Sequence, residues 1–122
     1  MTRPHFYLTR RAARDLRDIH MRSVTNWGQE RADAYLAEIY AVFAKVAASP
    51  ELGLLRAHRS VPFMMVPAGR HFVVYDRAAE GVIVLTVLHQ ARDIEHFIAE
   101  LRPSFLAEIA ALRRNARKAP ED

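Results

Sequence analysis

The chain of 122 residues contains no cysteine, which excludes disulfide frameworks, cysteine-ligated zinc sites and thiol catalysis. Long apolar runs are also missing, and stretches such as Val82–Leu88 are far too short to cross a bilayer. The first residues carry charge with no apolar core behind it, unlike a signal peptide. We therefore expect a cytoplasmic protein that does not enter a membrane.

Lysine is scarce, because only Lys45 and Lys118 among the 18 basic residues are lysine and the rest are arginine. The net charge of +4 and the isoelectric point of about 10.0 favour acidic partners or nucleic acid. A bias toward arginine is equally typical of genome composition, so charge alone identifies no function. The 51% hydrophobic and 26% charged residues are ordinary for one folded domain.

The first half of the chain predicts a short strand followed by a helical hairpin. Residues 5–9 alternate as a strand does, and Thr9 can cap a helix that runs to about Val24. Gly28 permits a turn, and beyond it apolar residues recur at helical spacing until Pro50 ends the second helix. Helices joined by so short a break are expected to pack antiparallel.

The second half predicts three strands and then helices. A turn cluster at 49–53 precedes strands over 61–66, 71–75 and 82–88, the last apolar enough for burial on both faces. Two C-terminal helices follow, from Asp93 and over 105–114. The fold class is α+β, a small antiparallel sheet with the hairpin on one face and C-terminal helices. Apolar side chains point to both faces of the middle strands, so either the C-terminal helices or another chain must cover the second face.

Several short motifs follow one another along residues 6–101. In order they are Leu8-Thr9, Ala12, Asp15-Leu16 and Ile19; Trp27-Gly28, Ala32 and Tyr35-Leu36; Pro50-Glu51-Leu52-Gly53; Gly69-Arg70-His71 with Tyr75; and Val87-Leu88-His89 with Arg92-Asp93. Their order and spacing resemble the ParE branch of the RelE/ParE toxins of bacterial type II toxin–antitoxin systems. The resemblance implies a toxin domain over residues 1–102, with 103–122 a helical extension of the same domain beyond the usual family end.

The family resemblance implies a choice between two activities. RelE-like members cut mRNA on the ribosome with lysines on the second sheet strand and an arginine on the third, whereas ParE-like members inhibit DNA gyrase. The aligned positions here hold Phe63, Met65 and Phe72, which can neither transfer a proton nor pair with a phosphate. The sequence therefore favours a gyrase inhibitor that is not an enzyme.

Two alternatives stay open. If the protein is an mRNA interferase, its catalytic candidates are His71, Tyr75, His89 and Arg92. Structural roles are the more usual ones for these residues: sheet packing for His71 and Tyr75, local hydrogen bonding for His89, and a place at a helix start for Arg92. A degenerate toxin that only binds an antitoxin is the other alternative, because Met64 replaces the arginine of the Gly-x-Arg motif that family members often carry. We expect no metal and no cofactor, since the sequence has no HExxH motif and no glycine-rich phosphate loop.

The resemblance implies two partners, DNA gyrase as the target and a cognate antitoxin that is ParD-like or similar. The expected assembly is either a toxin homodimer or a toxin–antitoxin hetero-oligomer. Two binding surfaces are expected. The first is an apolar platform for the antitoxin, formed by Phe63, Met64, Met65, Phe72 and Tyr75. The second is an electrostatic face of the first helix, formed by Arg10, Arg11, Arg14 and Arg17, although such a run is more often simply the solvated face of a helix.

Overall fold

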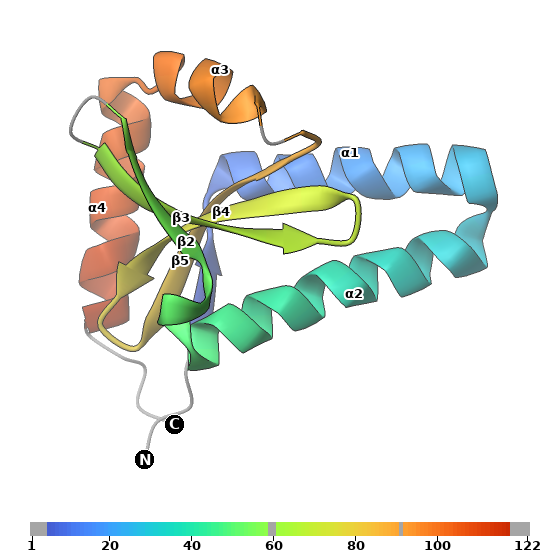
Figure 1. The fold of residues 1–122 in the computed structure, drawn as a ribbon, viewed down its shortest axis with the longest axis horizontal. Helices are drawn as coiled ribbons and strands as arrows, with labels where there is room; N and C mark the ends of the chain where they lie inside the picture. Colours follow the sequence, from blue (N-terminus) through green and yellow to red (C-terminus); the bar gives the residue numbers. More distant parts are fainter. Residues whose placement is uncertain (1–4, 59–60, 91, 118–122) are drawn as a thin grey trace.

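The computed structural model describes residues 5–58, 61–90 and 92–117 (Figure 1). Its elements are β1 His5–Leu8, α1 Arg10–Trp27, α2 Gln29–Ala48, the short 3-10 helix η1 Pro50–Leu52, β2 Leu54–His58, β3 Val61–Ala68, β4 His71–Ala78, β5 Gly81–Leu88, α3 Asp93–Ala99 and α4 Pro103–Arg117. This arrangement confirms the α+β class. No helix of the described ranges is both long and apolar enough to span a membrane.

The sheet is mixed, which corrects the expectation of a wholly antiparallel one. Its strand order is β1-β5-β4-β3-β2, with β2 to β5 antiparallel and β1 running parallel to β5. Parallel pairing needs a long connection, and everything from α1 to β4 lies between these two strands in the sequence. The residues that hold β1 and β5 together are thus about 75 positions apart, with Phe6 opposite Val82.

Strand β2 was not expected from the sequence. The segment Leu54–His58 shows no alternation of apolar and polar residues, and leucine, arginine and alanine are not strong strand formers. It becomes a strand because β3 pairs with it, Leu55 lying opposite Met64. As the outermost strand, β2 has one row of backbone groups facing away from the sheet.

The α1–α2 hairpin forms as expected and covers one face of the sheet. The Thr9 hydroxyl accepts a hydrogen bond from the Ala12 amide (3.0 Å) and donates one to the Leu85 carbonyl (2.8 Å), so it caps α1 and ties it to β5. Helix α1 continues to Trp27, three residues beyond the expected end, and stops where Gly28 adopts φ 89°. The core beneath the hairpin includes Leu16, Ile39, Phe43, Val73, Tyr75 and Val84.

The C-terminal helices cover the other face of the sheet. Of the two covers expected for it, the protein's own helices rather than another chain are the one observed. Phe97 and Ile98 of α3 are buried against Phe63, Met65, Val74, Ile83, Leu85 and Leu88. Helix α4 adds Phe105, Ile109 and Leu112 to the same cluster and lies across the sheet from the hairpin (Figure 1). Pro103 begins α4 rather than preceding it, since proline lacks an amide hydrogen that the first helical turn does not use.

Candidate functional site

The apolar platform expected to bind an antitoxin is buried in the structure, which corrects the expectation that this face is left bare. Met64 and Tyr75 point toward the hairpin, whereas Phe63 and Met65 point toward α3 and α4, because side chains alternate along a strand. All four are buried and Phe72 is half-buried. A partner could touch these side chains only by displacing the protein's own helices.

Tyr75 is a structural residue. Its hydroxyl donates to the Pro50 carbonyl (2.6 Å) and accepts from the Gly53 amide (2.8 Å), which pins η1 to the sheet. Burial is the main cause that raises the pKa of this phenol. Tyr75 has no exposed surface, which favours this structural role over a catalytic one.

The arginine face of α1 is partly occupied by the C-terminal helices. Arg10, Arg14 and Arg17 are exposed, but Arg11 is half-buried, pairs with Glu100 (3.5 Å) and lies over the Phe97 ring (4.8 Å). The backbone amide of Arg10 donates to Glu108 of α4 (2.7 Å). The four arginines are therefore not one free surface.

Asp15 is a half-buried carboxylate. In the sequence it stood out only as part of a family motif, and its structural role was not predicted. One of its oxygens accepts from the Thr86 hydroxyl (2.5 Å) and from the Val87 amide (3.0 Å), so Asp15 joins α1 to the end of β5. Burial raises its pKa, while these two hydrogen bonds act in the opposite direction. The contact positions α1 over the strand that leads to His89.

A histidine pair lies at the end of the sheet near the tip of the hairpin. The Tyr35 hydroxyl lies 2.5 Å from Nδ1 of His71, and Nε2 of His71 lies 3.5 Å from Nδ1 of His89. Tyr35 also accepts from the Arg70 amide (2.9 Å), and its hydroxyl lies 3.5 Å from the Ala68 carbonyl oxygen. These contacts hold the two imidazoles and the Tyr35 phenol in one chain of polar groups.

The surroundings of His71 disfavour its charged form. Burial, followed by the nearby His89 and Arg22, lowers the pKa of His71 from 6.5 to about 4. Because the folded pKa is depressed, the contribution of His71 to stability is complete above pH 6.5 and declines as the pH falls toward 4.

The variant H71N should therefore lose part of its pH dependence of unfolding. Asparagine cannot take up a proton, so the fall in unfolding free energy between pH 6.5 and pH 4 should be shallower than in the wild type. Urea unfolding at several pH values measures the slope. The matched control is A44N, which introduces the same amide at an exposed position of α2, removes no titratable group and should keep the wild-type slope. An unchanged slope in H71N would contradict the assignment.

Of the four nuclease candidates, the structure brings together only His71 and His89. Arg92 is exposed ahead of α3, where the Asp93 carboxylate accepts from the Gln90 amide (3.1 Å) and closes the turn. Neither the hydrogen bonds nor the ion pairs of the described ranges connect Arg92 with the histidines. The described residues also contain no group of three or more His, Asp or Glu side chains placed to hold a metal ion.

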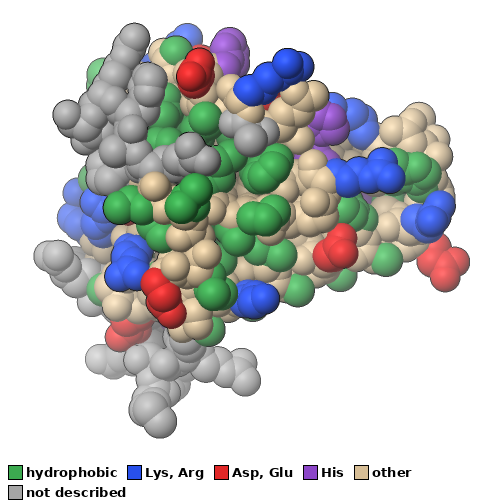
Figure 2. Space-filling view, in the orientation of Figure 1, with side chains coloured by type: hydrophobic (Ala, Val, Ile, Leu, Met, Phe, Trp, Pro, Cys, Tyr) green, Lys and Arg blue, Asp and Glu red, His purple; other side chains and the backbone are tan. Residues whose placement is uncertain are grey.

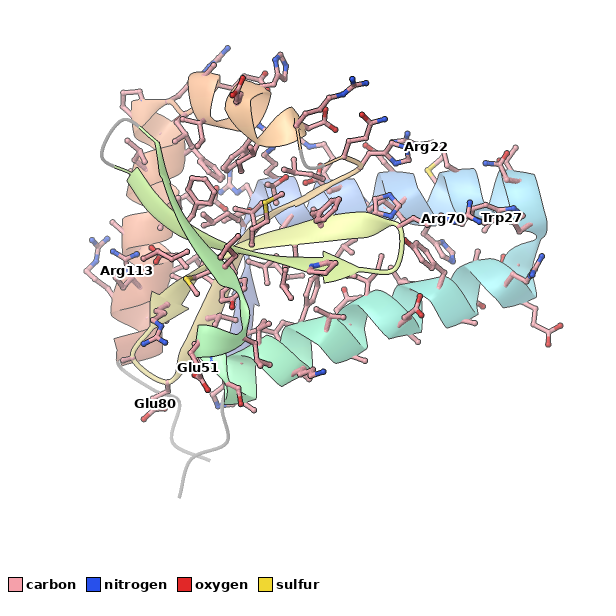
Figure 3. All side chains as sticks on the ribbon, in the orientation of Figure 1. Arg22, Trp27, Glu51, Arg70, Glu80 and Arg113 are labelled. Atoms are coloured by element: carbon pink, nitrogen blue, oxygen red, sulfur yellow. The ribbon has the colours of Figure 1, made fainter. Side chains whose placement is uncertain are left out.

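Beside the histidine pair lies a surface that sequence reasoning missed, which we name the Trp27 surface: Arg22, Trp27, Arg31, Tyr35, Arg70, His71 and His89. Arg70 in the β3–β4 turn places its guanidinium 5.4 Å from the centre of the Trp27 ring. Figure 3 shows Trp27 and Arg70 between the two helices of the hairpin, beside the β3–β4 turn, and Arg22 on the other side of α1 in this view. Trp27 and Arg70 belong to separate motifs 43 positions apart, and no local pattern signals that they meet.

Comparison with known proteins agrees with this architecture. Residues 6–94 match the family model described as the ParE toxin of type II toxin–antitoxin system, parDE. The chain is 34% identical to Toxin ParE1 of Caulobacter vibrioides over 70% of its own length and 88% of that protein. It is 30% identical to Toxin ParE1 of Mycobacterium tuberculosis over 74% of its length and 93% of that protein.

The chain therefore belongs to the ParE family of toxins of type II toxin–antitoxin systems. A solved structure described as a chromosomal ParDE system from P. aeruginosa shares the fold, with a TM-score of 0.60 and 17% identity over 70% of this chain and 95% of that one. The family model ends at residue 94, so α4 lies beyond the matched segment.

Proposed function

We propose that this toxin inhibits DNA gyrase and that a cognate antitoxin neutralises it. Family membership supports the proposal, and one structural observation favours gyrase over mRNA cleavage. At the strand positions where the nuclease branch carries cations, Phe63 and Met65 are buried beneath α3 and α4, and Phe72 is half-buried. RNA cleavage without a metal requires proton-transferring groups and cations at the phosphate, and this face provides neither.

The edge of β2 is the surface that we assign to the antitoxin. Leu52, Leu54 and Leu55 are 49%, 61% and 66% exposed, and they are neighbours in η1 and β2. Figure 2 shows hydrophobic side chains gathered on this face of the molecule. An extended segment can pair with the free backbone groups of an edge strand while its apolar side chains cover the leucines. The net charge of +4 favours a segment that also carries acidic residues.

A gyrase assay tests the proposal. The purified full-length toxin should inhibit supercoiling by gyrase or accumulate cleaved DNA, and the antitoxin encoded beside it should restore activity. The variant L55D should inhibit as the wild type does but require on the order of tenfold more antitoxin, because a charge replaces an apolar contact. The variant A44D, which changes an exposed α2 alanine, is the matched control for antitoxin sensitivity.

Two results would overturn the proposal. Codon-phased mRNA cuts in a translating extract, with gyrase unaffected, would make the protein an mRNA interferase. A folded toxin that binds the antitoxin yet affects neither gyrase nor translation would be a degenerate binding module. Equal antitoxin sensitivity of L55D and A44D would contradict the assignment of the β2 edge.

A further inference from the structure

Three arginines at the tip of the hairpin have no carboxylate partner among the residues that the structure describes. Arg22, Arg31 and Arg70 form none of the ion pairs found there, and all three are exposed. Elsewhere Arg77 and Arg113 pair with carboxylates, whereas Arg14 of α1, like several others, forms no ion pair with the described residues either. What distinguishes the hairpin tip is that its unpaired arginines lie beside aromatic rings. Unpaired guanidinium groups that gather on one surface are suited to an anionic ligand.

Two hollows adjoin at Trp27, which lines both of them. One, of about 220 Å³, is lined by Trp27, Arg31, Tyr35 and Arg70. The other, of about 80 Å³, lies between α1 and the histidine pair and includes Arg22 in its lining. No carboxylate contributes to the described lining of either hollow, but the Glu38 carboxylate lies beside Tyr35 and the β3–β4 turn. The Trp27 surface therefore combines aromatic rings with more positive than negative charge.

The β3–β4 turn holds Arg70 in a fixed place. Its amide donates to the Tyr35 hydroxyl, and Gly69 adopts φ 59°, where a side chain would lie 2.6 Å from the Tyr35 ring. The Arg70 guanidinium rests over Trp27, itself 43% exposed. The planar groups are thus arranged before any ligand arrives, which lowers the entropic cost of binding.

We propose that the Trp27 surface binds single-stranded nucleic acid, with a base stacked on the Trp27–Arg70 pair and phosphates held by Arg22 and Arg31. Aromatic rings beside guanidinium groups are the usual platform for unpaired bases, since every base has a face that can stack. DNA and RNA share this chemistry. The surface is not one for an acidic, amphipathic peptide, because its hollows offer no exposed aliphatic side chain, whereas the leucines of the β2 edge do.

Trp27 is the only tryptophan of the chain, so its own fluorescence reports the interaction. A 12-nucleotide single strand, DNA in one arm and RNA in the other, should quench the fluorescence of the full-length protein at low salt. Duplex DNA of the same length should quench it less, since its bases are already stacked. The affinity should fall with added salt, as counterion release requires.

Substitutions separate this surface from general charge attraction. Measured by the anisotropy of a labelled strand, R70Q and W27A should each weaken binding on the order of tenfold, and W27F should retain most of it. The matched control is R14Q, which removes the same charge from an exposed position of α1 outside both hollows and should weaken binding less than threefold. Thermal unfolding verifies that each variant folds, and R31Q replaces any variant that does not.

The outcomes are distinct from those of the gyrase assay, because binding is measured without gyrase. Absence of quenching by both strands at low salt would overturn the proposal. Equal losses of binding affinity in R70Q and R14Q would also overturn it. So would a glutamate-rich peptide that displaces the strand from the wild-type protein at equal charge concentration, because the surface would then be one for a peptide. A preference for DNA or for RNA would identify which source of the shared chemistry is bound.

Discussion

Replacing Ile109 by aspartate should lower the free energy of unfolding by about 3 kcal/mol, because it places a charge against the apolar face of the sheet. Ile109 packs from α4 onto the cluster that contains Phe63, Met65 and Val74. Ending the chain after Leu101 should cost more, on the order of 5 kcal/mol, since Phe105 and Leu112 are removed with it and the sheet face is bared to water. Such a loss is comparable with the whole stability of many small domains.

Urea unfolding followed by far-UV circular dichroism measures both changes. The matched control is A110D, which introduces the same charge at the neighbouring exposed position of α4 and should cost well under 1 kcal/mol. Size-exclusion chromatography of the truncated chain shows whether the bared face recruits a second copy. If I109D is as stable as A110D, α4 does not cover the sheet in solution and residues 103–122 serve another purpose.

Most of the helical architecture could be predicted from the sequence because its signals are local. Apolar residues at helical spacing, the hydroxyl of Thr9 and the proline at 50 act within a few positions of one another, and the hairpin forms where they place it. The continuous apolar run of β5 likewise indicated burial on both faces, and every residue of that strand is buried. The family motifs are local in the same sense.

What depended on distant pairing could not be predicted. Strand β2 exists because β3 lies beside it, and the parallel pairing of β1 with β5 depends on how a long connection packs. The apolar platform was expected to be open because sequence patterns show which side chains are apolar but not which helix covers them. Recognising that α4 covers Phe63 and Met65 required knowing where residues 103–117 return in space.

The candidate sites also depend on contacts between distant parts of the chain, which the sequence does not show. His71 and His89 were singled out by residue type, and the structure places them together, but their tie to Tyr35 joins α2 to a strand 36 positions away. The Trp27 surface combines residues from α1, α2, the β3–β4 turn and the end of β5, so no single motif contains it. Chemistry that arises from several elements becomes visible only when the sheet register is known.

The variant G81A should destabilise the protein by about 4 kcal/mol, because this glycine is where β1 meets β5. Gly81 has φ 151°, and a side-chain carbon there would lie 1.7 Å from the His5 carbonyl oxygen. The backbone of β1 must move away, although the His5 amide donates to the Glu80 carbonyl (2.8 Å) and β1 brings Phe6 and Leu8 to the core. The cost therefore combines backbone strain with lost strand pairing and packing.

Gly28 supplies a matched control for the same substitution. It also has a positive φ, 89°, but a side-chain carbon there meets nothing within 4 Å. The variant G28A should therefore show the backbone strain alone, about 1 kcal/mol. Urea unfolding of both variants separates the strain from the steric clash, and hydrogen exchange at the amides of β1 reports whether the strand detaches. Equal losses in G81A and G28A would mean that β1 shifts at no cost and that its parallel pairing contributes little to stability.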